Sequence, residues 1–281
     1  MIKIRLVSAA LLASALLCAQ SPKRVFVITD AEGVAGVCRQ DQTDPKDAEM
    51  RKLLTGEVNA AVDGFLAGGA EEVVVWDGHD GSQTLSALTI HPKAKIAWGN
   101  LDPTMTLERG YAAVAFIGQH AHANVTGGIM AHSYSSLGIQ TMLLNGKPVG
   151  EIETRAAIAG HYGVPVILLS GDKAAADDLR AIVPDAEFAV VKEGIGYYPC
   201  ISLSASAAQD LIREKARRAM ERAPRIKPYR LHGPVTLQVE YTTRSTPLPA
   251  RTLPPGAERV DARTIRFTGK DILEVWSRYR M

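Results

Sequence analysis

Apolar and polar positions change their spacing repeatedly along the chain. Several runs are almost wholly apolar, and Arg24–Asp30 and Tyr111–Ile117 are the clearest. Nearly uninterrupted apolar runs of this length are typical of strands in a parallel sheet that is buried on both faces. We predict strands at 24–30, 72–77, 94–99, 111–117, 164–171 and 188–191.

Between these runs, apolar residues recur at spacings of three and four, which indicates helices. The longest such segment, 44–67, ends at Gly68 and Gly69. Asp172 and Ser204 are suitable N-caps for two later helices. We predict helices at 44–67, 150–161, 172–182 and 204–223. Strands that alternate with helices predict an α/β fold, with a mainly parallel sheet covered by helices on both faces.

Two segments depart from this alternation. Asn145-Gly146 lies between the short apolar runs 138–144 and 147–149, which is a strong hairpin signal. From about residue 225 onward, the segment Val235–Tyr241 alternates like a half-exposed strand, and the chain closes with a strand at 264–268 and a helix at 270–280. We therefore divide the chain into an α/β catalytic domain (24–224) and a small C-terminal α+β appendage (225–281).

Residues 1–19 have the pattern of a secretory signal peptide. A short basic start precedes the apolar run 6–17. That run is too short for a membrane span, which needs about 20 residues. We expect cleavage after Ala19 and export to a periplasmic or extracellular location. A lipoprotein anchor at Cys18 is less favoured, because Leu17 is larger than the residue expected before it. No later stretch is long and apolar enough to predict a stable membrane span.

Composition adds two limits. The 281 residues are 46% hydrophobic and 22% charged, which is enough apolar material for a sizeable core. The net charge of +2 comes from mixed signs and gives no reason to expect nucleic acid as a partner. Cleavage would leave Cys38 and Cys200, and the sequence leaves open whether they pair or remain separate buried thiols.

Charged or imidazole side chains stand where the apolar strands end. They are Asp30, Glu32, His79, the loop from His120 to His132, and Glu151. Each has an ordinary explanation by itself, such as a hydrogen-bonded loop histidine or a first-turn glutamate. Together they favour a metal site, because the carboxyl ends of parallel strands meet at one edge, and Asp, Glu and His suit a divalent ion such as zinc. We expect His122 to be exposed, and His91, His161 and His232 to be incidental.

Five segments together resemble the zinc-dependent D-aminopeptidase family. Their order and approximate spacing match, and the similarity extends over nearly everything after the predicted signal peptide. The first segment reads Val-Ile-Thr-Asp-Ala-Glu-Gly-Val-Ala-Gly, and the fifth reads Asn-Gly-Lys-Pro-Val-Gly-Glu. The five segments are 27–36, 77–80, 118–121, 130–133 and 145–151.

The resemblance implies a site for two zinc ions. The implied ligands are Asp30, Glu32, His79, His120 and Glu151, with Asp30 bridging the two ions. His132 is the implied catalytic residue and not a ligand. The resemblance also implies a ring-shaped homo-oligomer, a decamer being one form to expect.

The expected function is an exported aminopeptidase that removes N-terminal residues, with D-amino acids favoured, from short peptides. In this mechanism the nucleophile is a water activated by two metal ions. One alternative is a metal-dependent amidohydrolase acting on another small amide. A second is a non-catalytic exported solute-binding protein, although such proteins usually have two lobes of similar size.

Overall fold

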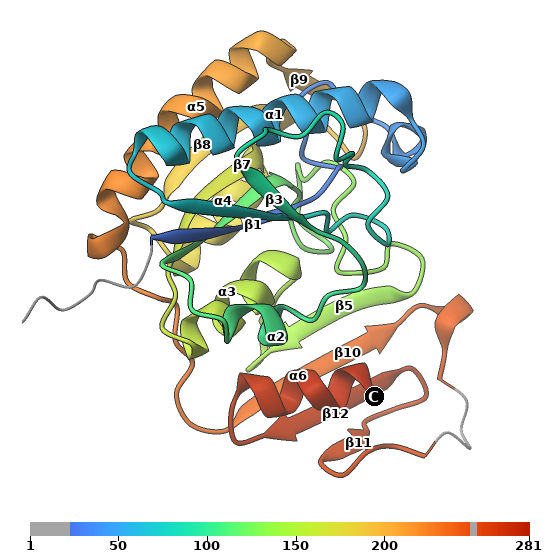
Figure 1. The fold of residues 1–281 in the computed structure, drawn as a ribbon. Coiled ribbons are helices and arrows are strands. Elements are labelled where there is room, and N and C mark those ends of the chain that lie inside the picture. Colours follow the sequence, from blue (N-terminus) through green and yellow to red (C-terminus); the bar gives the residue numbers. More distant parts are fainter. Residues whose placement is uncertain (1–22, 248–251) are drawn as a thin grey trace, which may run out of the picture.

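A seven-stranded sheet forms the centre of the molecule (Figure 1). The computed structural model describes residues 23–247 and 252–281, so the predicted signal peptide lies outside the described residues. The strand order is β3-β2-β1-β4-β7-β8-β9, and every pair of neighbours is parallel except β8 with β9. The prediction of a mainly parallel sheet is confirmed. The strands are β1 (Arg24–Thr29), β2 (Glu72–Trp76), β3 (Ala94–Ala97), β4 (Ala113–Gln119), β7 (Val166–Asp172), β8 (Glu187–Gly194) and β9 (Cys200–Ser202).

Helices cover both faces of this sheet. On one face α1 (Ala48–Ala67) packs along α5 (Ala205–Arg222), and on the other α3 (Glu151–His161) packs against α4 (Lys173–Ile182) and the short α2 (Pro103–Leu107) (Figure 1). The side chains of Asp172 and Ser204 cap α4 and α5 as expected.

Helix α1 begins four residues later than the predicted Asp44. Its N-cap is Asp47, whose carboxylate accepts a hydrogen bond of 2.7 Å from the backbone N–H of Met50. Gln40–Thr43 instead form a separate 3₁₀ turn. The capping bond fixes the first turn of the helix, which the apolar spacing alone could not locate.

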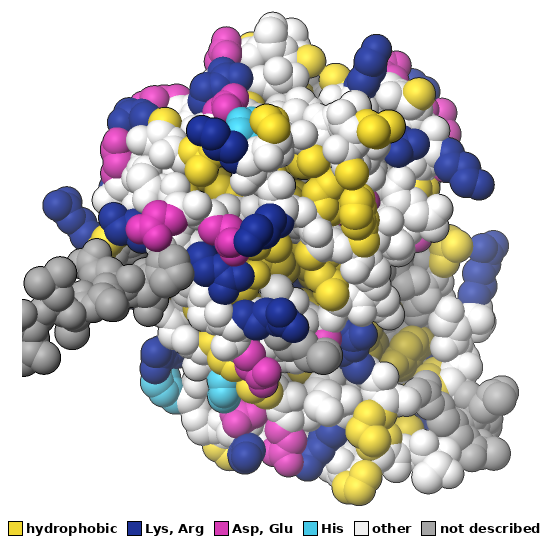
Figure 2. All heavy atoms as spheres, viewed as in Figure 1, with side chains coloured by type: hydrophobic (Ala, Val, Ile, Leu, Met, Phe, Trp, Pro, Cys, Tyr) yellow, Lys and Arg dark blue, Asp and Glu magenta, His cyan; other side chains and the backbone are white. Residues whose placement is uncertain are grey.

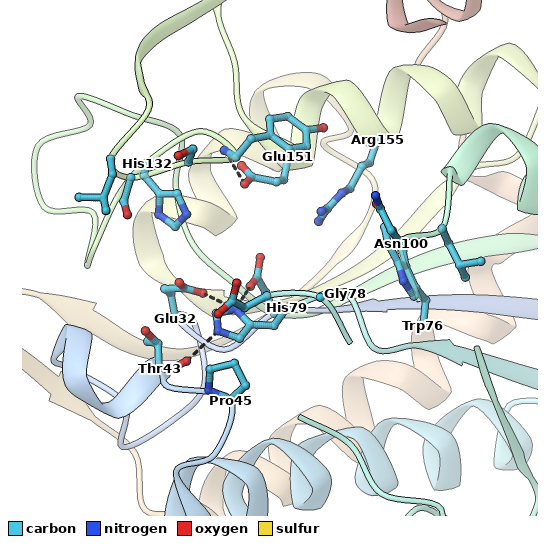
Figure 3. Close-up of a pocket in the computed structure, with 18 of the residues that line it drawn as sticks. Glu32, Thr43, Pro45, Trp76, Gly78, His79, Asn100, His132, Glu151 and Arg155 are labelled. Atoms are coloured by element: carbon cyan, nitrogen blue, oxygen red, sulfur yellow. Dashed lines mark hydrogen bonds and ion pairs between the residues drawn. The ribbon is translucent and has the colours of Figure 1, made fainter. Parts of the chain in front are cut away.

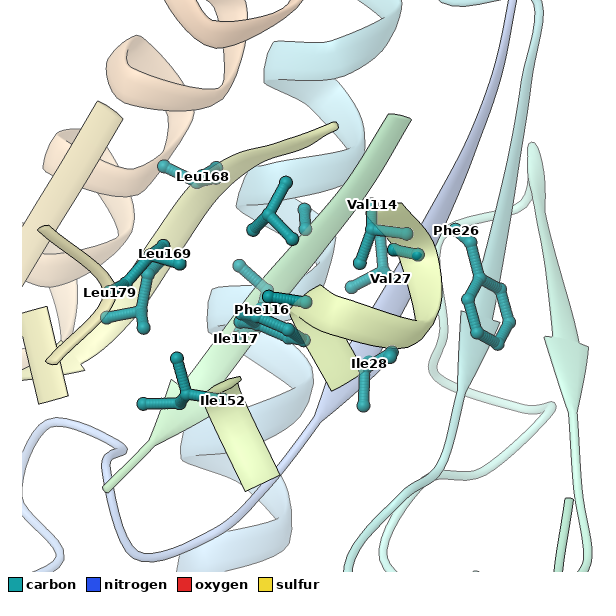
Figure 4. Close-up of a cluster of buried hydrophobic side chains, with 14 of the residues drawn as sticks. Phe26, Val27, Ile28, Val114, Phe116, Ile117, Ile152, Leu168, Leu169 and Leu179 are labelled. Atoms are coloured by element: carbon teal, nitrogen blue, oxygen red, sulfur yellow. The ribbon is translucent and has the colours of Figure 1, made fainter. Parts of the chain in front are cut away.

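The core is centred on three adjacent strands. Figure 4 shows the buried side chains that β1, β4 and β7 contribute, among them Phe26, Phe116 and Leu168. Each is fully buried, and burying one such side chain stabilises the fold by about 1.5–3 kcal/mol. These strands are therefore a rigid base for whatever side chains follow their carboxyl ends.

A second sheet is antiparallel and lies beyond α3 (Figure 1). The strand order is β11-β12-β10-β5-β6, and α6 (Ile272–Arg280) packs against β10 and β12. The region from residue 225 is α+β as expected, but it does not form this sheet alone, because the hairpin from the middle of the chain supplies two strands. These strands are β5 (Ile139–Leu144), β6 (Lys147–Pro148), β10 (Val235–Tyr241), β11 (Ala257–Arg259) and β12 (Thr264–Gly269).

The predicted hairpin turn is present. Asn145 and Gly146 have φ values of 50° and 79°. The tight two-residue turn requires such values, and Asn and Gly adopt them most readily. The side chain of Asn145 also accepts a hydrogen bond of 2.8 Å from the backbone N–H of Thr236. This turn therefore fixes how the C-terminal strands join the middle of the chain.

Cys38 and Cys200 form a disulfide, with their Cα atoms 6.1 Å apart. The bond links the loop after β1 to β9, which resolves the question that the sequence left open. Within the described ranges, no helix has both the length and the apolar character that a membrane crossing requires. On the face seen in Figure 2, Lys and Arg side chains are interspersed with Asp and Glu.

Candidate metal centre

The predicted site residues meet at the carboxyl end of the main sheet. Asp30 and Glu32 follow β1, His79 follows β2, and His120 follows β4. The neighbours of β1 are β2 on one side and β4 on the other, so the chain winds outwards in both directions from this strand. Ligands bind at this kind of switch point in open α/β sheets. Glu151 joins the group as the first residue of α3.

Two glycines let the loops after β1 and β4 approach closely. The Gly33 backbone N–H donates to the Gly118 carbonyl over 2.8 Å. A Cβ at Gly33 would lie 2.0 Å from the Gln119 carbonyl oxygen, and one at Gly118 would lie 2.2 Å from that of Asp30. Any side chain at either position would push the two loops apart. These glycines therefore bring the carboxylates of one loop beside the imidazole of the other.

A buried lysine supports the loop that follows β1. Lys192 of β8 donates to the backbone carbonyls of Val34, at 2.9 Å, and of Glu32 and Val37. Glu57 of α1 accepts from the backbone N–H of Ala35 over 2.8 Å. One cation and one carboxyl group thus supply hydrogen-bond partners to backbone groups of this loop.

The two ring nitrogens of His79 have different partners. Nε2 lies 2.8 Å from the Thr43 carbonyl oxygen, which only an N–H can contact in this way. Nδ1 faces the carboxylates, 2.9 Å from Asp30 Oδ1 and 3.3 Å from Glu32 Oε2 (Figure 3). A backbone carbonyl that holds one ring N–H commonly orients the other nitrogen towards a metal. His79 therefore turns Nδ1 towards the carboxylates of Asp30 and Glu32.

His120 has the opposite arrangement. Its Nδ1 lies 2.9 Å from the Ala121 carbonyl oxygen, which leaves Nε2 to face Asp30 Oδ2 at 3.7 Å and Glu151 Oε1 at 4.0 Å. Asp30 therefore stands between two imidazoles, with one oxygen towards each. Glu151 Oε1 also accepts a hydrogen bond of 2.7 Å from the backbone N–H of Tyr134, which fixes its carboxylate.

His132 lies against His120, with ring centroids 4.0 Å apart and an angle of 14° between the rings. Its Nδ1 contacts the Met130 carbonyl oxygen at 2.8 Å, so Nε2 is the free nitrogen. Two overlapping groups have donor atoms within 4.8 Å of one another: Asp30, Glu32 and His120, and then His120, His132 and Glu151. Position alone therefore admits His132 as a ligand as well as a catalytic group.

Unpaired polar atoms test whether the site suits a metal. Among the described residues, Glu151 Oε2 and His120 Nε2 are buried and have no hydrogen-bond partner, and the buried Glu32 Oε2 has only the contact with His79 Nδ1 at 3.3 Å. Leaving such groups unpaired is costly, and carboxylates that share a site repel one another. A divalent cation relieves both costs, and a set of Asp, Glu and His donors suits zinc. The residues present therefore fit the metal that the sequence predicted.

The titration of the two imidazoles leads to a prediction about zinc affinity. Burial by itself would lower the pKa of both rings. Hydrogen bonds to Asp30 and Glu32 nevertheless raise the pKa of His79 to about 11, and the charges of Glu151 and Asp30 raise that of His120 to about 9. Both rings are then protonated at neutral pH in the metal-free protein, and each would have to lose a proton to bind zinc.

We expect the zinc affinity to rise with pH. Below the lower of the two pKa values, two protons leave on binding, so the logarithm of the association constant should rise by up to about two per pH unit. Competition with a chelator of known affinity at pH 6, 7 and 8 measures this slope. A slope near zero over that range would contradict the proton competition.

A third group of potential metal ligands contains none of the predicted site residues. His122, Glu153 and Asp178 also bring donor atoms within 4.8 Å of one another. The Asp178 carboxylate accepts from the His122 backbone N–H at 3.0 Å and lies 3.7 Å from its Nε2. His122 is half-buried rather than exposed as predicted, because this pairing holds it against α4. The other three histidines, His91, His161 and His232, do not line the cavity above the carboxylates.

A cavity of about 800 Å³ opens over the carboxylates. Figure 3 shows Glu32 and His79 on one side, His132 and Glu151 on another, and Arg155 and Trp76 further along. The C-terminal helix α6 completes the wall. Sequence reasoning missed the following lining residues: Trp76, Asn100, Tyr134, Arg155, Trp276 and Arg280. Of these, only Arg155 carried a local signal, as a charged residue on the otherwise apolar side of a helix that begins at Glu151.

Buried carboxylates and imidazoles at the switch point of a doubly wound sheet are an arrangement suited to a metal-dependent hydrolase. The model of the D-aminopeptidase family, Peptidase M55, matches residues 23–281, and the chain belongs to this family. The chain is 28% identical over 259 residues to the D-aminopeptidase of Bacillus subtilis (strain 168), covering 90% of this chain and 94% of the relative.

A solved structure agrees with this assignment. The zinc-dependent D-aminopeptidase DppA from Bacillus subtilis, described as a self-compartmentalizing protease, superposes with a TM-score of 0.81 at 28% identity. The match covers 92% of this chain and 95% of DppA. The protein is therefore a zinc metallo-aminopeptidase of α/β fold, as the sequence predicted, and the alternative of a non-catalytic solute-binding protein is set aside.

Proposed function

We propose that this protein removes N-terminal D-amino acids from short peptides, using two zinc ions held by Asp30, Glu32, His79, His120 and Glu151. The observation that carries the proposal is the set of buried, unpaired donor atoms around Asp30 at the base of the cavity. Asp30 has one oxygen towards His79 and the other towards His120, which supports a bridging role. When bound, the two ions supply a water nucleophile near neutral pH and polarise the scissile carbonyl.

The chain itself contributes a proton-transfer group. The Met130 carbonyl accepts the Nδ1–H of His132, so Nε2 is free to take a proton or to give one. Met130 has a φ of 50°. This left-handed conformation is unusual for a residue with a side chain, and it turns the carbonyl towards the ring. His132 would then serve as the general acid–base group, donating to the leaving amine.

The remaining wall would limit the access of water to the reacting bond. Trp276 is buried, Tyr134 is half-buried, and their rings pack with centroids 5.2 Å apart. Since α6 carries Trp276, the C-terminal region would take part in catalysis by closing the cavity. Charged groups inside a drier cavity interact more strongly than in water.

Metal removal and restoration test the activity. A chelator should abolish hydrolysis of D-Ala-D-Ala, and zinc should restore it, with about two ions bound per chain. The enzyme should cleave D-Ala-D-Ala faster than L-Ala-L-Ala. An N-acetylated peptide should be cleaved at least about 100-fold more slowly, because the free amine is part of the recognised group.

These substrates separate the alternatives. Cleavage of the N-acetylated peptide as fast as the free one would favour the second candidate, an amidohydrolase acting on another small amide. Failure to cleave either enantiomer with two zinc ions bound would refute the aminopeptidase proposal.

We also propose export. The basic start and apolar run of residues 1–19 support it, since this is the pattern of a signal peptide. The disulfide between Cys38 and Cys200 supports it too, because such bonds persist in oxidising compartments. Sequencing the N-terminus of the mature protein tests this, and the expected first residue is Gln20. Recovery of intact residues 1–19 in the cytoplasm would contradict it.

A homo-oligomeric ring is proposed as well. Its support is the description of DppA as self-compartmentalizing and the exposure of large apolar side chains around β9. Sedimentation equilibrium measures the assembly mass, and a monomer at micromolar concentration would refute the ring. The exposed side chains are Ile195, Tyr197, Tyr198, Ile201 and Leu203.

A further inference from the structure

Arg155 is a buried cation at the wall of the cavity. It lies on α3 one turn after Glu151, and the residue is only 6% exposed. Its Nη1 is buried and has no hydrogen-bond partner. Among the described residues, no carboxylate forms a salt bridge with it, although the same cavity contains three buried acids, Asp30, Glu32 and Glu151.

Two aromatic rings hold the guanidinium in place. The central carbon of Arg155 lies 5.4 Å from the centroid of the Trp76 ring and 5.7 Å from that of Tyr134. Cation–π contacts at this distance position a guanidinium without using its N–H donors. The donors therefore remain available, and Figure 3 shows the side chain pointing into the cavity beside Glu151.

A second donor in the same wall also lacks a partner. The indole Nε1 of Trp276 is buried and makes no hydrogen bond. Its ring packs on Tyr134, which also contacts Arg155, so both donors adjoin one aromatic side chain. A buried guanidinium N–H and an indole N–H without acceptors are costly unless a ligand supplies the acceptor.

We propose that Arg155 binds the terminal carboxylate of a dipeptide substrate, which would make the enzyme a dipeptidase by preference. This inference rests on the proposed function, since it requires the free amine of the peptide to lie at the metal end of the cavity. A planar guanidinium with free N–H donors can bind both oxygens of a carboxylate at once, and the carboxylate of a short peptide is its terminal group.

The spacing agrees with a dipeptide. Glu151 and Arg155 are four residues apart on one helix, which separates their backbone positions by about 6 Å along its axis. Two extended residues span about 7 Å. A substrate whose amine lies near Glu151 would therefore place its carboxylate close to Arg155 after two residues rather than after many.

An acidic side chain on the second residue would offer the same chemistry as the terminal carboxylate. Three substrates separate these sources: D-Ala-D-Ala, its C-terminal amide, and D-Ala-D-Glu with its terminal carboxylate amidated. We expect the wild-type, zinc-loaded enzyme to prefer the first over the second by on the order of 100-fold in kcat/KM, as is typical of a buried charge pair. The third should be cleaved as poorly as the second.

Arg155→Met should remove this preference. Its kcat/KM for D-Ala-D-Ala should fall on the order of 100-fold, whereas that for the amide should change by less than about threefold. Arg155→Lys should be intermediate, since lysine keeps the charge but not the planar pair of donors. The matched control is Arg180→Met, because the Arg180 guanidinium also lies over an aromatic ring, 4.3 Å from the Phe188 centroid, but does not line the cavity.

Binding supplies a readout that is independent of catalysis. The ligand for calorimetry is the analogue of D-Ala-D-Ala whose peptide bond is reduced to CH₂–NH. The wild-type enzyme should bind this analogue more tightly than its C-terminal amide, and Arg155→Met should lose this difference in affinity. If the wild-type enzyme cleaves no peptide, the proposed activity fails while calorimetry still decides the role of Arg155. If Arg155→Met does not fold, Arg155→Lys decides it by the same ratio.

Three results would overturn the inference. They are equal use of the free acid and the amide by the wild-type enzyme, an unchanged ratio in both Arg155 variants, and a preference for the D-Glu side chain with an amidated terminus.

Discussion

Asp30→Asn should abolish both zinc retention and peptide hydrolysis. Asp30 has one carboxylate oxygen 2.9 Å from His79 and the other 3.7 Å from His120. An amide keeps the shape but removes the charge that would neutralise two cations. We expect a loss of zinc affinity greater than about 100-fold, the upper value for losing a group that only supports a ligand.

Metal analysis of the dialysed protein measures this effect directly. The bound zinc should fall from two ions per chain to less than one, with kcat/KM falling in parallel. The matched control is Asp63→Asn on α1, which removes a half-exposed carboxylate paired with His91 and Arg213. Its zinc content should equal that of the wild type. Two ions retained in Asp30→Asn would refute the bridging role of Asp30.

The directions in which the pKa values of Asp30 and Glu32 shift agree with a bridging role for Asp30. Burial, and then repulsion from Glu32, raises the pKa of Asp30. Burial also acts to raise the pKa of Glu32, but the hydrogen bond from His79 holds it well below its usual value. In the metal-free site, protons are therefore distributed over the carboxylates and the imidazoles. In the holoenzyme, zinc would replace those protons.

His132→Gln should lower kcat while leaving two zinc ions bound. The His132 ring stacks on His120 at 4.0 Å, and its Nε2 is free because Nδ1 contacts the Met130 carbonyl oxygen. Losing a general acid–base group typically costs about 10²–10⁴-fold, so we expect a fall in kcat of that size. KM should change little, because in the proposed mechanism the ring binds neither the amine nor the carboxylate of the substrate.

Zinc content distinguishes the two roles that position alone admits for His132. It belongs to one of the two donor groups, with His120 and Glu151. If His132→Gln loses one zinc ion, the residue is a ligand, and the catalytic role is wrong. His161→Gln is the matched control, because His161 is exposed at the end of α3 and contacts Tyr162; it should keep wild-type zinc content and kcat.

Much of the main sheet could be predicted from residue patterns because its strands are buried on both faces. The runs around Phe26 and Phe116 are apolar throughout, and their short length together with their β-branched and aromatic residues favours a buried strand over a helix. The short elements α2, β9 and β11 were not predicted. A strand of three residues such as Cys200–Ser202 has too few positions to show a period, and only its pairing with β8 defines it.

The strand that pairs with the hairpin could not be predicted from the sequence either. Asn145-Gly146 determined the turn, because only a few residues adopt two successive left-handed conformations. That β5 would pair with β10, far along the chain, depended on packing between distant segments. The C-terminal α6 consequently reaches the cavity, and Trp276 joins its wall.

For the metal centre, the sequence by itself determined which side chains stand at the strand ends, since local pattern fixes where each strand stops. Asp30, His79 and Glu151 are examples, and their chemistry already pointed to zinc. Only the tertiary structure decided which nitrogen each histidine presents, because distant carbonyls such as that of Thr43 select it. Only the tertiary structure also shows that Nη1 of Arg155 has no hydrogen-bond partner. Whether a charged side chain is paired depends on every element that surrounds it.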